Sequence, residues 1–375
     1  MIYLDHAAST PPFPDVVQHV ERLLAHPPAN PSGAHSAAQA ASGILEDARD
    51  EVAALLGAQP REVIFTSGGS ESDNFALKGP ILGKAPSHIV VTAVEHHAVL
   101  DTAKWLESQG HEVSLAFPGA DGIVDPDSVL AHCRPDTALV SVMLVNNETG
   151  VIQPVKAIAS AIRGQVPDVL VHTDAAQAMS ALQVNFEDLG VDLLTLSGHK
   201  FGGLQGTGAL LVKDGTRLTP LIHGGGQELG RRAGTSNVVG YSAFAAALRI
   251  AVDRREEFVA VTELLTGRLI SQIKSSKVDN GDVTARVPHI TSMCFEGLRS
   301  EDLVMLLDRE GVCVSGGSSC ASGATEPSHV LLAMGRDPEV ARGALRVSVN
   351  ADCVEAEIDQ AASAIDAVVE ALRSR

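Results

Sequence analysis

Apolar residues recur along the chain with two different spacings, and each spacing predicts one kind of element. Between residues 36 and 56 apolar side chains return every three or four positions, and Gly57 follows directly after them. This spacing is typical of an amphipathic helix, and a glycine after the last apolar turn is a common helix C-cap. Six shorter runs are almost entirely apolar and rich in branched side chains: Glu62–Thr66, His88–Thr92, Leu139–Val145, Val169–Thr173, Leu193–Leu196 and Ala209–Val212.

The six short runs predict the fold class. Near-continuous apolar runs separated by helix-length segments are typical of parallel strands that are buried on both faces of an α/β sheet. We therefore predict an α/β fold with a mainly parallel sheet in a large domain. Ligands of such sheets bind beyond the carboxyl ends of the strands, so polar residues that follow the runs are the first candidates for a site.

Two domains are predicted from the order of the elements. The sheet and its helices form a large α/β domain over residues 14–245. We expect one long helix over Tyr241–Lys274, and beyond it fewer strands and an amphipathic helix over residues 354–372. Residues 1–13 and 246–375 are therefore predicted to form a smaller α+β domain, which also carries Cys320.

The composition excludes some classes of function but adds little to the predicted fold. The chain has 375 residues, of which 45% are hydrophobic and 20% charged, as in ordinary globular proteins. Its formal net charge of −18 at pH 7 repels phosphodiester backbones and anionic lipid, and the aromatic residues that stack on bases make up only 3%. We therefore expect no direct binding of nucleic acid and no association with a membrane.

The five cysteines are scattered and odd in number, with no CxxC pair. This pattern predicts neither a disulfide framework nor a zinc module, so no metal site is expected. The first ten residues, MIYLDHAAST, lack the basic and apolar stretches of a secretory signal. The cytoplasm is the expected location.

Two charged side chains follow successive apolar runs. Asp174 comes directly after Val169–Thr173, and Lys200 comes four residues after Leu193–Leu196. A lysine at the mouth of a partly desolvated pocket can have a lowered pKa, which frees its amine for Schiff-base chemistry. Pyridoxal 5'-phosphate (PLP) needs such a lysine together with a carboxylate for its ring nitrogen. Taken singly, the two residues are more simply a turn aspartate and a surface lysine, and only the combination points to PLP.

A phosphate site is predicted where the run Glu62–Thr66 passes into a helix. The turn holds Gly68, Gly69 and Ser70, whose backbone N–H groups would lie at the positive end of the helix dipole. A serine-capped turn without any ligand is the alternative, since neither a GxGxxG nor a Walker motif is present.

Two further segments carry candidate chemistry. His96, in Val-Glu-His-His-Ala-Val, either lies flat on a cofactor ring or is a histidine at the edge of the core. Cys320 lies in a run of Gly, Ser and Ala that offers little apolar packing, so we expect an accessible and reactive thiol.

The order and spacing of many short motifs narrow these alternatives. The motifs include YLDHAA at residues 3–8, FTSGGSESDN at 65–74, EHHAVL at 95–100, VNNETG at 145–150, HTDAAQ at 172–177, SGHK at 197–200, RRAGT at 231–235 and SGGSSC at 315–320. Over most of its length the chain resembles the cysteine desulfurases, PLP enzymes of the class V aminotransferase group. The resemblance implies the fold-type-I architecture of that group.

The resemblance implies a role for each matching residue. Lys200 would bind the aldehyde of PLP, Asp174 would pair with the ring nitrogen and His96 would stack on the ring. Gln177 would bond the phenolic oxygen of the ring, and Cys320 matches the nucleophile of the family.

The phosphate and the substrate have their own implied partners. The phosphate would be held by Gly69, Ser70, Ser197 and His199. Thr235 would reach this phosphate from a second subunit, which implies a homodimer with shared active sites. Asn147 and Arg346 would orient the substrate carboxylate, and Asn147 would also contact the cofactor.

The implied reaction converts L-cysteine to L-alanine and leaves the sulfur on Cys320 as a persulfide. An acceptor protein would then take the sulfur, either an iron–sulfur scaffold or a thiolation enzyme. The nearest alternative is another class V PLP enzyme, a selenocysteine lyase or an aminotransferase. A non-catalytic subunit that relays sulfur is the alternative from a different class. Lys200 and Asp174 do not distinguish the enzymes, whereas Cys320 favours sulfur transfer.

Overall fold

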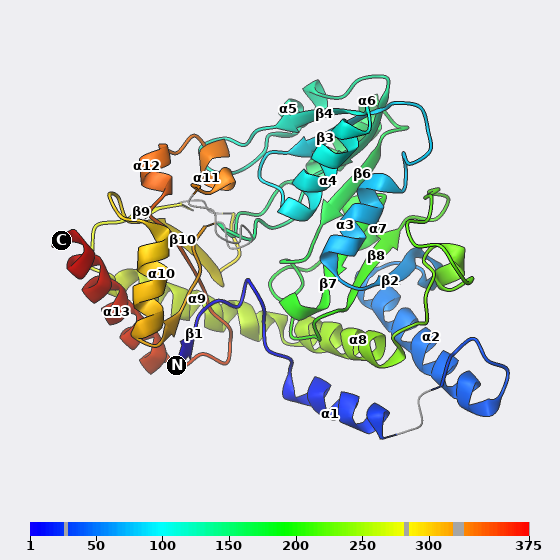
Figure 1. Cartoon of the computed structure of the whole chain (residues 1–375), viewed down its shortest axis with the longest axis horizontal. Coiled ribbons are helices and arrows are strands. Elements are labelled where there is room, and N and C mark those ends of the chain that lie inside the picture. Colours follow the sequence, from blue (N-terminus) through cyan, green and yellow to red (C-terminus); the bar gives the residue numbers. More distant parts are fainter. Residues whose placement is uncertain (26–28, 281–284, 318–325, 375) are drawn as a thin grey trace.

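A seven-stranded sheet with helices on both faces dominates the computed structural model (Figure 1). The structure describes residues 1–25, 29–280, 285–317 and 326–374. In spatial order the strands are β2 (Val63–Thr66), β8 (Gly208–Val212), β7 (Leu193–Ser197), β6 (Leu170–Asp174), β5 (Thr137–Ser141), β3 (His88–Thr92) and β4 (Glu112–Ala116). The predicted α/β class with a mainly parallel sheet is confirmed.

Most helices of the first two thirds of the chain cover the two faces of this sheet. The helices of this part of the chain are α1 (Pro14–Leu24), α2 (Ser36–Leu56), α3 (Gly69–Lys78), α4 (His97–Ser108), α5 (Pro126–Ala131), α6 (Val155–Gln165), α7 (Phe186–Leu189) and α8 (Val238–Asp253), with single 3-10 turns η1 (Pro60–Glu62), η2 (Gly198–Lys200) and η3 (Glu228–Gly230). Among them, α1 packs on α8 rather than on the sheet. The predicted helix over residues 36–56 is α2, and its C-cap Gly57 adopts φ 64°.

Successive strand residues pack on opposite faces. Ile64 lies in the apolar cluster beneath α3 and α4, whereas Phe65 lies in the cluster beneath α2 and α8. Both residues are fully buried. Because both faces are covered, the strands are apolar throughout, and this explains the continuous apolar runs in the sequence.

One predicted parallel strand runs the other way. The run Ala209–Val212 forms β8, which is antiparallel to both β2 and β7. Only a short loop separates β7 from β8, too short for the crossover that a parallel pair needs. The sheet also ends in β4, a half-exposed strand that the sequence patterns did not predict. The strand predicted over Leu139–Val145 ends at Ser141, and the residues after it turn toward the site.

A second core lies in the C-terminal part of the chain. The strands and helices of this part of the chain are β9 (Val278–Asp279), β10 (Ile290–Cys294), β11 (Val312–Cys313), β12 (Ala344–Ser348), α9 (Arg255–Gln272), α10 (Ser300–Arg309), α11 (His329–Ala333), α12 (Pro338–Ala341) and α13 (Glu355–Arg373). Residues of α9, α10, α13 and the strands β10, β11 and β12 form the second core, whereas α11 and α12 pack on the core of the large sheet. The first strand, β1 (Ile2–Tyr3), pairs in parallel with β11, so the N-terminus lies beside this second core (Figure 1).

The single helix predicted over Tyr241–Lys274 is wrong. The chain forms α8 and α9 with a break at Arg254, whose φ of −95° and ψ of 7° are not helical. The predicted boundary after residue 245 falls inside α8, and the division into domains stays a prediction. No helix among the described residues has both the length and the apolar character needed to cross a membrane.

Candidate active site

A cavity of about 500 Å³ opens at the carboxyl ends of the parallel strands. Its lining includes ten of the twelve residues predicted for the site: Gly69, Ser70, His96, Asn147, Asp174, Gln177, Ser197, His199, Lys200 and Arg346. The strand order explains this convergence, because loops that follow neighbouring parallel strands meet at one edge of the sheet. Of the other two, Thr235 is exposed and lies outside this cavity, and Cys320 lies outside the described residues.

Two strand ends supply the charged groups of the cavity. Asp174 is the last residue of β6, and Lys200 ends η2, the turn that follows β7. Burial raises the pKa of the Asp174 carboxyl, while the hydrogen bond from the Ala176 N–H and the charge of Lys200 lower it. The buried carboxyl therefore lies near a positive charge, and a protonated ring nitrogen would be a second cationic partner for it.

The amine of Lys200 is held by the N-terminal segment. Its Nζ donates to the carbonyl oxygens of Ala7 and Ala8 at 2.8 and 2.9 Å. The amide of Gln177 donates to the same Ala7 oxygen at 2.8 Å. Two carbonyl groups from the start of the chain therefore orient two side chains from the middle of it.

His96 presents an uncharged ring to the cavity. It is the N-cap of α4, and its Nδ1 accepts a hydrogen bond from the Ala98 N–H at 3.1 Å. Burial, together with the nearby charge of Lys200, lowers the pKa of His96 to about 4. At neutral pH the ring is therefore neutral, with the proton on Nε2, and it can lie against a planar ring without adding charge.

The predicted phosphate turn is tightly packed. A Cβ on Gly69 would lie 3.3 Å from Cβ of Ser197, and a Cβ on Gly208 would lie 2.7 Å from the backbone of Gly68. Gly68, Gly69 and Ser70 line the cavity, and the first N–H groups of a helix have no partner within the helix. His199 lies beside this turn, and burial, followed by the charge of Lys200, lowers its pKa to about 4.

Arg346 also lines the cavity and is only 2% exposed. Its Nη1 donates to the backbone oxygen of Asn147 at 2.9 Å, and its Nη2 donates to Oδ1 of Asp5 at 2.7 Å. Its Nε has no hydrogen-bond partner among the described residues. A buried guanidinium with unused donor capacity is suited to a ligand carboxylate.

Sequence reasoning missed a group of buried carboxyls. Asp73 lines the cavity at 1% exposure, and burial and the charge of Asp174 raise its pKa well above the ordinary range. Burial also raises the pKa of Glu95 to about 8, against the hydrogen bond from Thr92. Asp73 follows Ser70 by three positions on α3, and this spacing on one helix face could have pointed to it.

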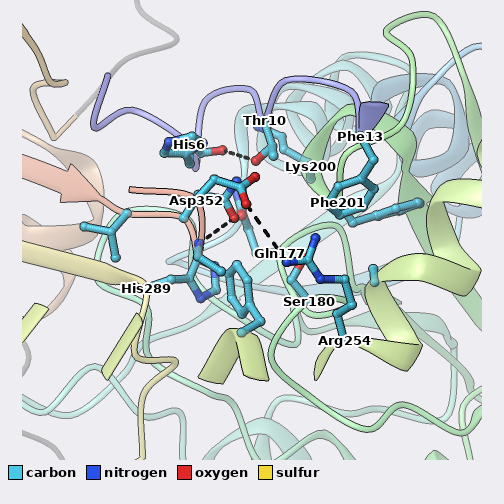
Figure 2. Close-up of a pocket in the computed structure, with 15 residues that line it drawn as sticks. His6, Thr10, Phe13, Gln177, Ser180, Lys200, Phe201, Arg254, His289 and Asp352 are labelled. Carbon is cyan, nitrogen blue, oxygen red and sulfur yellow. Dashed lines mark hydrogen bonds and ion pairs between the residues drawn. The ribbon is translucent and has the colours of Figure 1, made fainter. Parts of the chain in front are cut away.

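Lys200 and Gln177 also line a second, smaller cavity of about 30 Å³ (Figure 2). His6 and His289 lie on its far side, and Nδ1 of each has no partner among the described residues. Arg254 and Asp352 lie at its rim, 4.0 Å apart. Lys200 and Gln177, which line both cavities, therefore lie between the larger cavity and the smaller one. No cluster of three or more His, Cys, Asp or Glu side chains suited to a metal ion occurs in the described part of the chain.

The comparisons with known proteins agree with this geometry. The family model described as aminotransferase class-V matches residues 2–361. The cysteine desulfurase IscS of Dictyoglomus turgidum is 38% identical over 379 residues, which cover 100% of this chain and 95% of that protein. Among solved structures, a NifS-like protein superposes with a TM-score of 0.92 at 33% identity, covering 100% of both chains. A structure titled "SspA in complex with cysteine" has a TM-score of 0.83 at 34% identity and covers 94% of this chain and 100% of that one.

The chain therefore belongs to the aminotransferase class-V family and is a PLP-dependent enzyme with the fold-type-I architecture. Within that family, relatives over its full length are cysteine desulfurases, and the chain is a member of this group.

Proposed function

We propose that this cysteine desulfurase converts L-cysteine to L-alanine and that Cys320 receives the sulfur as a persulfide. One observation carries the proposal: groups suited to PLP and groups suited to an amino-acid carboxylate line a single cavity. The relative whose title names a complex with cysteine supports the choice of substrate.

The cavity fits the ring of PLP. Lys200 would bind the aldehyde, and Asp174, a buried carboxyl, would hold the proton on the ring nitrogen. The neutral His96 would lie on the face of the ring, and Gln177 would bond the phenolic oxygen. When bound, PLP supplies an electron sink for the pair released at the substrate Cα.

The phosphate of PLP would lie at the start of α3. Gly69 lies so close to Ser197 that a side chain there would be crowded, and its backbone N–H at the start of α3 would bond the phosphate. Ser70, Ser197 and the neutral His199 would add side-chain donors. We propose that Thr235 completes this site from a second copy of the chain, because it is exposed and lies outside the cavity of its own chain.

In the same cavity, Arg346 and Asn147 would hold the carboxylate of cysteine. Asp5 orients the guanidinium of Arg346 from behind. The amine of Lys200, once released, would take the proton from Cα, since it lies in the same cavity.

Sulfur transfer balances without an added oxidant. The thiolate of Cys320 attacks the thiol sulfur of the substrate, an S–S bond forms and the bond between this sulfur and Cβ breaks. The electron pair of the broken bond stays with the carbon, which ends as the methyl group of alanine after it gains a proton. The substrate thiol releases its proton, so the persulfide carries the negative charge of the attacking thiolate, and the one proton that the carbon gains balances the one released. The thiolate is the required form of the nucleophile.

We further propose that the enzyme is a homodimer in the cytoplasm and passes its sulfur to an acceptor protein. The acceptor is an iron–sulfur scaffold or a thiolation enzyme. The net charge of −18 supports delivery through a protein rather than direct contact with a nucleic acid or a membrane.

A product assay tests the proposal. Purified protein loaded with PLP is incubated with L-cysteine and a reductant, and we expect alanine and sulfide in equal amounts. Without reductant, mass spectrometry should find one added sulfur on the peptide with Cys320, and C320S should release no sulfide. Sulfide release by C320S at the wild-type rate would exclude the persulfide on Cys320. A keto acid in place of alanine would indicate an aminotransferase.

A further inference from the structure

Glu148 is a buried carboxyl outside the cavity that the proposed function does not use. It follows Asn147 in the loop after β5 and is only 3% exposed. Its Oε2 accepts a hydrogen bond from Oγ of Ser328 at 2.5 Å, and its backbone N–H donates to Oδ1 of Asn146 at 3.0 Å. Burial raises the pKa of Glu148 to about 7, although the bond from Ser328 and the charge of Arg346 oppose the rise. A carboxyl buried at such a cost calls for a structural or functional reason.

Two ends of one chain segment meet at this carboxyl. Gly317 is the last described residue before Cys320, and Ser328 is the third described residue after it. A Cβ on Gly317 would lie 3.0 Å from Cβ of Ser328 and 3.2 Å from Oε2 of Glu148. Gly317 therefore packs directly against both groups, and any side chain there would press on them.

Ser328 has a second bond that fixes its position. Its Oγ accepts from the Leu331 N–H at 3.2 Å and so caps the first turn of α11. The hydroxyl donates to Glu148 while it accepts from this helix. The carboxyl thus holds the end of the segment that leads into α11.

The segment that leads toward Gly317 is tied to the substrate end of the cavity. Ser315 and Arg346 exchange two backbone hydrogen bonds, at 2.8 and 3.2 Å. The guanidinium of Arg346 bonds in turn to the backbone oxygen of Asn147, the residue next to Glu148. The stem formed by Gly317, Ser328 and Glu148 therefore rests on the residues proposed to hold the substrate carboxylate.

We propose that Glu148 is a positioning residue for sulfur transfer: its carboxyl fastens the stem of the Cys320 segment beside Arg346, so that the thiol reaches the sulfur of bound cysteine. The proposal rests on the proposed function. A residue that holds only the stem acts on the step of Cys320 and leaves the binding of cysteine intact. That separation distinguishes it from a residue that shapes the whole cavity.

The test measures the two steps separately on the PLP-loaded enzyme. Binding of L-cysteine is followed by the change in cofactor absorbance, and the rate of persulfide formation on Cys320 by quenched-flow mass spectrometry. We expect E148A to slow persulfide formation about tenfold or more, the size of one lost hydrogen bond to a charged group, with the Kd for cysteine within about twofold. E148Q keeps an oxygen that accepts from Ser328, so it should retain most of the wild-type rate.

Two further variants complete the test, one at the stem and one as a control. G317A adds a methyl group that would press on Ser328 and Glu148 from the other side of the stem. It should also slow persulfide formation while cysteine binding is unchanged. E62Q alters another buried carboxyl, which bonds the backbone N–H groups of Gln59 and Asp214 far from the stem, and should behave as wild type.

Each of the remaining outcomes would contradict one part of the proposal. Wild-type persulfide rates in both E148A and G317A would overturn the role of the stem. A Kd for cysteine that rises as far as the rate falls would show that Glu148 shapes the substrate site instead. If the wild-type enzyme forms no alanine from cysteine, the proposed function itself fails, which is distinct from a failure of the variants.

Discussion

Several ionisable side chains around the candidate active site are held neutral by burial. His172 is fully buried, and burial lowers its pKa to about 3, while its ring nitrogens bond the hydroxyls of Ser141 and Thr195. Burial raises the pKa of Glu95 to about 8. These groups keep the region beneath the cavity almost free of charge, so the ionised form of Asp174 is opposed by few other anions.

This neutrality predicts a pH effect for Glu95. A carboxyl whose pKa is raised in the folded state keeps its proton there, whereas the unfolded chain releases it above about pH 4.5. Stability therefore falls as pH rises from about 4.5 to about 8, by up to about 1.4 kcal/mol per pH unit. E95Q cannot release a proton, so its Tm should fall less than that of wild type between pH 6 and 8 in differential scanning calorimetry.

E107Q serves as the matched control, since Glu107 is exposed on the neighbouring helix α4. It should keep the pH dependence of wild type. Equal losses of Tm in E95Q and wild type over this range would show that Glu95 is already ionised at pH 6.

At the scale of elements, a buried ion pair fixes the loop that carries Thr235. Glu228 bonds Nη1 and Nη2 of Arg49 at 2.8 and 3.0 Å and accepts from the Phe65 N–H at 2.9 Å. Glu228 and Leu229 both have positive φ, 49° and 57°, which side chains rarely adopt. The bonds to α2 and β2 therefore hold the turn in a strained shape.

Loss of this buried ion pair should lower the free energy of unfolding much more than loss of an exposed ion pair. E228A leaves the guanidinium of Arg49 buried without its main partner, and we expect a loss of about 3–5 kcal/mol in the free energy of unfolding. Glu46 is the second partner of the same arginine, but its side chain is 57% exposed, so E46Q should cost less than about 1 kcal/mol. Urea denaturation of the two variants measures both values, and similar small losses would contradict the anchoring role.

The residues and elements also show what the sequence could predict. Asp174 and Lys200 were found because buried runs mark strands and polar residues after them mark the site edge. The ties from Ala7 and Ala8 to Lys200 could not be found, since they are backbone contacts between distant parts of the chain. The break at Arg254 was missed because α8 and α9 join with only one non-helical residue between them.

At the scale of the whole molecule, the proposed dimer makes each site depend on two chains. Thr235 would serve the cavity of the partner, whereas Lys200 serves its own. K200A and T235A chains, each with its own affinity tag, are co-expressed, and the mixed dimers are purified. Each mixed dimer should hold one complete site, with Lys200 from one chain and Thr235 from the other. We expect it to bind PLP at that site as tightly as wild type, measured by absorbance titration.

The T235A homodimer should bind PLP more weakly than this mixed dimer. Equal weakness in both would place Thr235 in its own chain's site, and wild-type affinity in both would place it outside any site. A mass of 39.0 kDa in light scattering, with no larger species, would exclude the dimer.

The N-terminal segment gives the molecule an order of assembly. Residues 2 and 3 pair with residues 312 and 313, Asp5 pairs with Ser348 and bonds Arg346, and Ala7 and Ala8 hold Lys200. During synthesis the first residues made must therefore wait for strands that are among the last to leave the ribosome. The large sheet can fold earlier, but its lysine acquires its final orientation only when the chain is almost complete. A growing chain thus has the strands of its main sheet before the N-terminal carbonyl groups that bond the Lys200 amine are fixed in place.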